Sequence, residues 1–120
     1  MTSQLAAVLG ARDLTTSPST AASAKAATGG DAASIEVAEI YAPFSHQQLL
    51  LTEAIGLPSS TKINPSGGAL AANPMFSAGL ERIGFAAQHI WNGSARRVLA
   101  HATSGPALQQ NLVAVMEGKN

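Results

Sequence analysis

The stretch from Lys62 to Trp91 constrains the fold of this chain more than any other. It begins as a short strand over 61–63 and continues as a glycine-rich turn over 64–68, because Asn, Pro, Ser and Gly punctuate regular structure. Asn73 and Pro74 then predict the start of a helix. Asparagine caps free N–H groups, and proline suits the first helical position because its missing N–H would be unpaired there. A strand, a turn and a helix are therefore expected in succession.

Apolar residues recur at helical spacing in the second half of this stretch and predict the face that the helix turns towards the core. That face consists of Phe76, Leu80, Ile83, Ala87 and Ile90. Three polar residues are expected to point elsewhere: Glu81, Arg82 and Gln88. Three further apolar residues lie outside the predicted face: Met75, Phe85 and Trp91. A helix that is apolar on more than one side needs cover on more than one side.

A strand, a turn of small residues and a helix N-terminus suit a ligand that carries phosphate or a developing negative charge. Gly67 and Gly68 would let such a ligand approach the backbone closely. The same glycines are also explained by the turn alone, because glycine adopts turn conformations without steric cost. Asn73 is likewise explained by capping alone. The residues of this stretch leave both interpretations open.

The rest of the chain alternates strands and helices. Ser34–Tyr41 alternates in the manner of a strand, and Pro43–Ile55 follows as a helix. Arg97–Ala102 and Asn111–Glu117 predict two more strands, which a Ser-Gly-Pro turn joins as an antiparallel pair. We therefore expect an α/β domain with a mixed sheet covered by helices. Four side chains should provide that cover: Phe44, Leu51, Ile83 and Ile90.

The first part of the chain differs in composition from the rest. Alanine dominates it, and 19–27 reads as a helix with few large apolar residues. Such a segment cannot form a core of its own and is expected to pack on a neighbour. The sequence thus divides into an alanine-rich lead-in segment over 1–33 and a domain over 34–118.

Composition and charge limit the classes of function. A chain of 120 residues with 46% hydrophobic and 12% charged residues suits one globular domain. The formal net charge is zero, which removes the simplest case for binding nucleic acid or an anionic membrane. Cysteine is absent, which excludes disulfides, zinc thiolates and a cysteine nucleophile. No apolar run approaches the ~20 residues that span a bilayer, and no signal-peptide pattern is present, so we expect a cytoplasmic protein.

Basic and metal-binding side chains give little indication of a site. The three histidines show no i, i+4 pairing and no acidic cluster, so no metal site is predicted. Arg96 and Arg97 read as a solvated junction between a helix and a strand. Contact of this pair with a coenzyme A phosphate is the alternative.

From about Ser34 to Gly118 the chain resembles the C-terminal part of a thiolase, most closely of the sterol-carrier-protein type or the lipid-transfer-protein thiolase-like group. Three landmarks occur in the family's order. The segment Glu39–Leu57 (EIYAPFSHQQLLLTEAIGL) is similar to the N-E-A-F or H-D-C-F segment and the helix after it. The segment Asn64–Pro74 (NPSGGALAANP) is similar to the N-x-x-G-G…G-H-P segment. The segment His101–Glu117 is similar to the closing hairpin, whose loop often bears a cysteine.

The resemblance implies a thiolase-like C-terminal domain, which is an incomplete half of that fold. It implies the function of an acyl-CoA acyltransferase, of the acetyl-CoA acetyltransferase or lipid-transfer type, in lipid metabolism. A coenzyme A thioester would be the substrate, and no cofactor is expected. By position, the resemblance assigns catalytic places to Tyr41 and Asn73. It assigns substrate-binding places in two loops: Ser66, Gly67, Gly68, Ser104 and Gly105.

Three positions depart from the family's pattern. Asn73 stands where the family has the G-H-P histidine, and asparagine cannot exchange protons near neutral pH. Tyr41 stands where the family has the N-E-A-F asparagine, and Ala107 stands near the place of the late cysteine. Acyl transfer needs an acyl-accepting thiolate, a base and donors around the thioester oxygens. The family's cysteine-bearing N-terminal half is not in this chain, so we expect no activity of the chain alone.

Two functions of different classes follow. In the first, the chain is the C-terminal portion of an acyltransferase and acts with a partner that supplies the thiolate or the base. Tyr41 and Asn73 would then polarise the thioester. In the second, the chain is a degenerate thiolase domain that binds acyl-CoA or a partner without turnover, or a gene remnant. The expected partners are a thiolase N-terminal half or further copies of the chain, and the sequence specifies neither the acyl chain nor the oligomeric state.

Overall fold

The computed structural model describes residues 2–3, 13–105 and 107–119. Strands and helices alternate along it, which confirms the predicted α/β class. The elements are β1 (Thr2–Ser3), α1 (Pro18–Thr28), β2 (Val37–Ile40), α2 (Ser45–Ile55), β3 (Lys62–Ile63), α3 (Gly68–Ala71), α4 (Ala78–Trp91), β4 (Arg97–Ser104) and β5 (Gln110–Glu117). None of the helices among the described residues is long and apolar enough to cross a membrane.

The strands form one mixed sheet in the order β1-β5-β4-β2-β3. Strand β2 runs parallel to β4 and to β3, with Glu39 opposite Ala100. Strand β5 runs antiparallel to β4 and to β1, which confirms the predicted hairpin. The two edge strands, β1 and β3, have two residues each. Such short edges offer little backbone for unwanted strand pairing.

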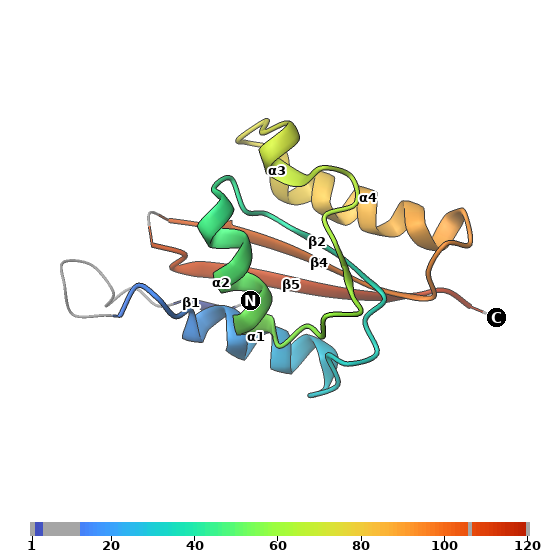
Figure 1. The fold of residues 1–120 in the computed structure, drawn as a ribbon, viewed down its shortest axis with the longest axis horizontal. Coiled ribbons are helices and arrows are strands. Elements are labelled where there is room, and N and C mark those ends of the chain that lie inside the picture. Colours follow the sequence, from blue (N-terminus) through green and yellow to red (C-terminus); the bar gives the residue numbers. More distant parts are fainter. Residues whose placement is uncertain (1, 4–12, 106, 120) are drawn as a thin grey trace.

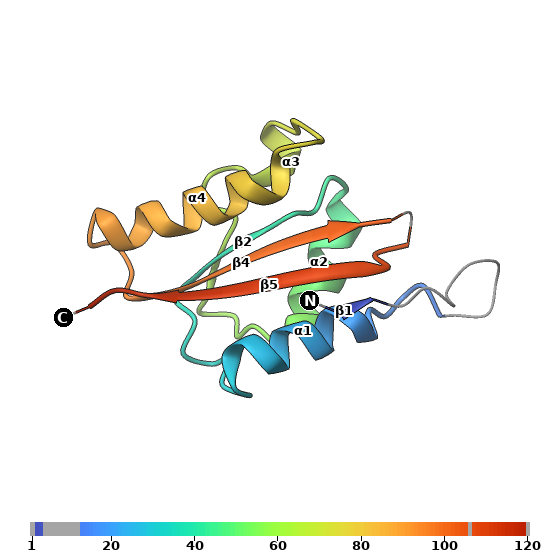
Figure 2. The same ribbon diagram turned by 180° about the vertical axis from the view of Figure 1, so that it is seen from behind.

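Helices cover both faces of the sheet, α1 and α2 on one and α4 on the other (Figures 1 and 2). The core on the α1 and α2 side consists of Ala24, Ile35, Ala38, Ile40, Ala42, Leu51, Ile55, Leu99 and Leu108. The core on the α4 side consists of Val37, Ala86, Ala95, Val98 and Ala100, with Ile83, Ile90 and Met116 packed against it. Strand β2 is buried along its whole length, as a strand covered on both faces should be.

Helix α1, predicted over 19–27, packs on β5 through small polar side chains. Ser19 Oγ donates to the carbonyl oxygen of Leu108 at 3.1 Å, and Ser23 Oγ donates to that of Asn111 at 3.1 Å. Small side chains let the helix axis approach the strand closely, and each buried hydroxyl finds an acceptor there. The alanine-rich segment therefore packs on a neighbouring element, as its composition predicted.

The face that α4 turns towards the sheet differs from the prediction. Its buried residues are Ala78, Arg82 and Ala86, whereas Leu80 is 72% exposed and Phe76 is fully exposed. The reason is the close approach of the helix to β4. A Cβ built on Gly79 would lie 2.8 Å from the Cβ of Ala102, so small residues must face the strand here. Ile83 and Ile90 pack at the side of this contact, as predicted.

The predicted start of α4 is also wrong. The helix begins at Ala78 after Ser77, and Asn73 is an exposed residue outside it. The carbonyl oxygen of Pro74 accepts hydrogen bonds from the N–H groups of Ser77 and Ala78. The Asn-Pro pair therefore begins a turn that precedes the helix. The helix itself starts only after this turn, at Ala78.

Two further expectations on the α2 side are corrected. Phe44, predicted to cover the sheet, directly precedes α2 and is 58% exposed, because the helix begins at Ser45. Strict alternation over the predicted strand Ser34–Tyr41 would place Ile35 on one face with Val37, but Ile35 belongs to the core with Ala38. Strand β2 begins only at Val37, so the alternation of faces does not extend back to Ile35.

Candidate functional site

An open pocket of about 420 Å³ lies at the edge of the sheet where β2 and β4 end. The two strands are parallel, so their carboxyl ends meet at one edge. Residues just beyond the carboxyl ends of parallel strands are where α/β sheets commonly bind ligands. We call this the carboxyl-edge pocket. Its main lining residues are Tyr41, Phe44, Met75, Phe76, Ser104 and Gly105.

The pocket unites some of the residues that the sequence singled out and leaves others apart. Tyr41, Ser104 and Gly105 line it together, although they come from different ends of the chain. Asn73 and the turn residues 66–68 are not among the residues that line it.

Sequence reasoning missed the contribution of the segment before α4. Met75 is 70% exposed and Phe76 fully exposed, and both line the pocket instead of the core. The available signal was the spread of apolar residues beyond a single helical stripe, because apolar residues without a place in the core face a pocket or an interface. Gln47, one turn into α2, was missed as well and carried no comparable signal.

The polar groups of the pocket are hydrogen-bonding groups without charge. Tyr41, Gln47, Thr103 and Ser104 supply hydroxyls and an amide, and the described lining holds no Asp, Glu, His, Lys or Arg. The side-chain oxygen of Gln47 is buried and has no hydrogen-bond partner among the described residues. Buried polar atoms normally have a partner, so this oxygen suits a ligand N–H or O–H. The lining can therefore hold a polar ligand through hydrogen bonds to hydroxyl and amide groups.

Tyr41 is held in place by its backbone. Its N–H donates to the carbonyl oxygen of His101 at 3.1 Å, which extends the β2–β4 pairing by one residue. Nearby, the ring of Phe44 stacks on that of His46 with centroids 5.8 Å apart. The rim of the pocket is therefore aromatic and exposed beside a rigid strand end.

The hairpin between β4 and β5 brings Ser104 and Gly105 to the pocket. Gly105 has a φ of 86°, and a Cβ built there would lie 2.5 Å from Oε1 of Gln109. Only glycine fits this position without displacing the loop. Ala107, at the place of the family's late cysteine, is half-buried in the same loop.

The glycine turn has an internal structural explanation. Gly67 and Gly68 both have positive φ, 92° and 60°, and a Cβ on Gly68 would lie 2.8 Å from Nδ2 of Asn64. Asn64 Oδ1 accepts a 2.6 Å hydrogen bond from the N–H of Ile40, and its Nδ2 donates to Gln48 Oε1 at 2.9 Å. These bonds attach the turn to β2 and α2. The positive φ angles and the lack of space for a Cβ are enough to explain both glycines without a ligand.

A buried charged cluster anchors this turn to β2 and α4. Glu39 and Arg82, both almost fully buried, form an ion pair with 3.5 Å between Oε2 and NH1. Ser66 donates to the same carboxylate twice, from its N–H at 3.0 Å and from its Oγ at 2.6 Å. The N–H of Gly68 in turn donates to Ser66 Oγ at 3.2 Å. Arg82, predicted to point away from the core, is therefore its central charged group, because Glu39 on the facing strand supplies a partner.

A second polar network lies on the α1 side. His101 on β4 is fully buried, with Nε2 3.0 Å from Oδ1 of Asn111. Asn111 Nδ2 donates to Ser19 Oγ at 2.7 Å and to the carbonyl oxygen of Leu108 at 2.8 Å. Since the amide nitrogen is used as a donor, the Asn111 oxygen faces His101, and Nε2 of the ring carries the proton. Burial lowers the pKa of His101 from 6.5 to about 4, so the ring is neutral at pH 7.

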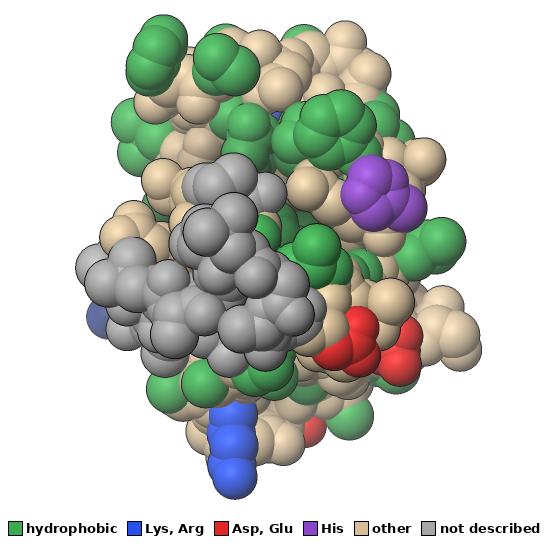
Figure 3. Space-filling view, turned by 90° about the vertical axis from the view of Figure 1, so that its left-hand side faces the viewer, with side chains coloured by type: hydrophobic (Ala, Val, Ile, Leu, Met, Phe, Trp, Pro, Cys, Tyr) green, Lys and Arg blue, Asp and Glu red, His purple; other side chains and the backbone are tan. Residues whose placement is uncertain are grey.

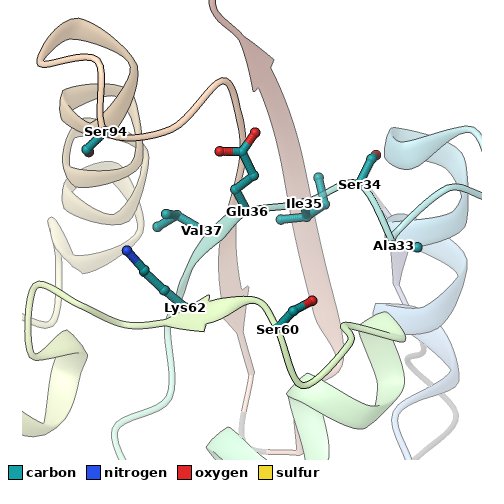
Figure 4. A pocket seen from close by; sticks show the side chains of 8 residues that line it. All are labelled: Ala33, Ser34, Ile35, Glu36, Val37, Ser60, Lys62 and Ser94. Atoms are coloured by element: carbon teal, nitrogen blue, oxygen red, sulfur yellow. The ribbon is translucent and has the colours of Figure 1, made fainter.

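A smaller pocket of about 240 Å³ lies at the opposite, amino-terminal edge of β2. Figure 4 shows its lining side chains, with Glu36 and Lys62 on neighbouring segments of the chain. Arg97, considered from the sequence as a phosphate contact, begins β4 and pairs instead with Asp31 at 3.2 Å and Glu117 at 2.9 Å. None of the predicted site residues lines this pocket.

Comparisons with known proteins identify no relative of this chain. No family model, curated protein or solved structure matches the chain. Among the described residues there is also no group of three or more His, Cys, Asp or Glu that could hold a metal ion. The function must therefore be argued from the carboxyl-edge pocket itself.

Proposed function

We propose that the chain is the C-terminal portion of a thiolase-like acyl-CoA acyltransferase, of the acetyl-CoA acetyltransferase or lipid-transfer type, and that it is inactive alone. The observation that supports this proposal is that residues of the first and third family-like segments line one pocket. Tyr41 belongs to the first family-like landmark, and Ser104 and Gly105 belong to the third. Met75 and Phe76 directly follow the second.

The chemistry of the lining suits a thioester with an amide-containing arm. The hydroxyls of Tyr41 and Ser104 can donate to a thioester oxygen, where negative charge develops during acyl transfer. The unpaired oxygen of Gln47 can accept from an amide N–H of the pantetheine arm of coenzyme A. Phe44 and Phe76 offer apolar surface to an acyl chain.

The nucleophile would come from a partner. The chain has no cysteine, and the described lining has no base that exchanges protons near neutral pH. A thiolase N-terminal half would supply the acyl-accepting thiolate, as such chemistry requires. In that complex Tyr41 would polarise the thioester. Asn73, outside the pocket, would act only if the partner brought the substrate to it.

The same lining also favours a second candidate, a non-catalytic acyl-CoA-binding domain. A pocket whose polar side chains are all uncharged can bind a thioester but cannot by itself activate a nucleophile. The two candidates share the ligand and differ in whether a partner with a cysteine makes turnover appear.

Titration of acetyl-CoA into the purified chain, followed by calorimetry, tests the shared ligand. We expect one site per chain, abolished by Ser104→Trp, because Ser104 is exposed at the pocket and an indole would fill it. The matched control is Ser60→Trp, because Ser60 is an exposed serine of the smaller pocket at the amino-terminal edge of β2; this variant should bind as the unaltered chain does. Gln47→Leu should weaken binding about tenfold if the amide oxygen accepts a hydrogen bond. Absence of binding, or equal loss in both tryptophan variants, would refute acyl-CoA as the ligand.

A further inference from the structure

Helix α4 exposes two large apolar residues on the side away from the sheet, although Ile83 and Ile90 pack against the core. Its sheet side is made of Ala78, Arg82 and Ala86, all buried. On the opposite side lie Leu80, 72% exposed, and Trp91, 79% exposed. An ordinary surface helix has polar residues on the side that faces water, so Leu80 and Trp91 depart from that pattern. Figure 3 shows hydrophobic side chains gathered at the end of the molecule that carries α3 and the start of α4.

Gly84 lies in the middle of this outer side. It is exposed, has ordinary helical φ, and a Cβ built on it would meet nothing within 4 Å. A glycine inside a helix costs roughly 0.5–1 kcal/mol relative to alanine. Nothing within the described chain requires glycine here, whereas close approach of a second backbone would. We define the outer stripe of α4 as Ser77, Leu80, Gly84, Gln88 and Trp91, in which Gln88 is an exposed polar residue one turn after Gly84.

The outer stripe is complementary to itself. Ser77 and Trp91 lie equally far before and after Gly84, about 10 Å along the helix axis at 1.5 Å per residue. When two copies of α4 cross antiparallel at Gly84, Trp91 of each copy therefore reaches Ser77 and Phe76 of the other. A two-fold axis through the glycine contact makes both halves of the interface identical.

Charge and area are compatible with this arrangement. Within α4, Arg82 is buried, Glu81 pairs with Arg82 at 3.6 Å, and His89 Nδ1 lies 2.8 Å from Ser94 Oγ, so no unpaired like charges meet. Phe76 and Trp91 alone expose roughly 350 Å², since aromatic side chains bury about 150–250 Å² each. That is close to half of the ~800 Å² that each partner contributes to a standard interface. Leu70, Met75 and Leu80 are also more than half exposed and add to it.

We propose that a second copy of this chain covers the outer stripe, in an antiparallel two-fold pairing of α4 with α4 that crosses at Gly84. This inference does not rest on the proposed function, although Met75 and Phe76 lie at both the carboxyl-edge pocket and this surface. It identifies the surface that would bury the exposed side chains of Leu80 and Trp91.

Sedimentation of the full chain over a concentration series tests the pairing. We expect a reversible monomer–dimer equilibrium, and Leu80→Glu should raise the dissociation constant roughly tenfold or more, because it buries a charge in an apolar contact. Leu49→Glu is the matched control, since Leu49 is 74% exposed on α2 and lies outside the outer stripe. A monomer at every concentration would overturn the proposal, as would an equal effect of the two glutamate variants.

Covalent capture tests the crossing point. The chain has no cysteine, so Gly84→Cys introduces a single thiol, which the two-fold axis would place beside its own copy. Disulfide formation requires Cα atoms within about 7 Å, so mild oxidation should link the Gly84→Cys chains rapidly into dimers. Leu49→Cys, exposed to a similar degree, is the control. Cross-linking of both variants at the same rate would show that the copies do not meet at Gly84.

Discussion

At the scale of single residues, His101 couples the stability of the fold to pH. Its pKa is lowered by burial to about 4 in the folded chain, against 6.5 when exposed. As the pH falls below 6.5, the unfolded chain therefore takes up this proton before the folded chain does. We expect the free energy of unfolding to decrease between pH 6.5 and about 4, by up to roughly 3 kcal/mol from this residue.

Urea denaturation at a series of pH values measures this dependence. His101→Phe keeps an aromatic ring on β4 without a titrating group and should lose most of the slope in that window. An unchanged slope in the variant would assign the acid sensitivity in this window to groups other than His101.

Also at this scale, the ion pair between Glu39 and Arg82 is a structural element that fails when one partner is removed. Glu39→Leu leaves the guanidinium of Arg82 buried without its carboxylate, and Ser66 loses both of its acceptors. We expect a loss of about 3–5 kcal/mol in the free energy of unfolding. The double variant Glu39→Leu, Arg82→Leu should recover part of it, because no charge is then buried alone.

A double-mutant cycle by denaturant unfolding measures the coupling of the pair. If the losses of unfolding free energy in Glu39→Leu and Arg82→Leu add up to the loss in the double variant, the two side chains act independently. Glu39→Leu removes the acceptor of Ser66 in both the single and the double variant. Proteolysis within the turn over 64–68 should therefore accelerate in both.

At the scale of elements, we expect replacement by alanine to change the stability of the fold in opposite directions at the two glycines of α4. Gly79→Ala forces a methyl group against Ala102 at 2.8 Å and should destabilise the fold by about 1–3 kcal/mol. Gly84→Ala meets nothing within 4 Å and should stabilise the isolated chain by roughly 0.5–1 kcal/mol through helix propensity. Unfolding is measured at low concentration, where the chain is monomeric. Equal signs for the two variants would contradict the close packing of α4 on β4.

At the scale of the whole molecule, the missing nucleophile decides activity. The purified chain should not cleave acetoacetyl-CoA, because it contains no cysteine that could accept the acyl group. Thiolysis is followed by the absorbance of the substrate enolate. Addition of a cysteine-bearing thiolase N-terminal half should produce turnover if the acyltransferase proposal is right, and none if the domain is non-catalytic. Cleavage by the isolated chain would refute both.

The candidate site was only partly predictable, for a physical reason. Tyr41, Ser104 and Gly105 were assigned to a site from the resemblance, and they line one pocket because β2 and β4 are parallel neighbours that end at the same edge. Met75 and Phe76 line the pocket because α4 begins later than Asn73 indicated. A helix start is decided by a few hydrogen bonds, here those accepted by the carbonyl oxygen of Pro74, and several neighbouring starts fit the same residues.

The sequence by itself determined the order of the longer strands and helices, the mixed sheet and the antiparallel hairpin, because periodicity and turn chemistry act between neighbours in the chain. It did not predict the two-residue strand β1 or the four-residue helix α3. Only the tertiary structure decided which face of α4 is buried. That choice depends on the sheet. The small residues Ala100 and Ala102 of β4 let α4 approach closely, so that only small helix residues fit against them, and Glu39 of β2 forms an ion pair with Arg82. Leu80 and Trp91 consequently face outward, since a helix cannot turn all its apolar sides to one sheet.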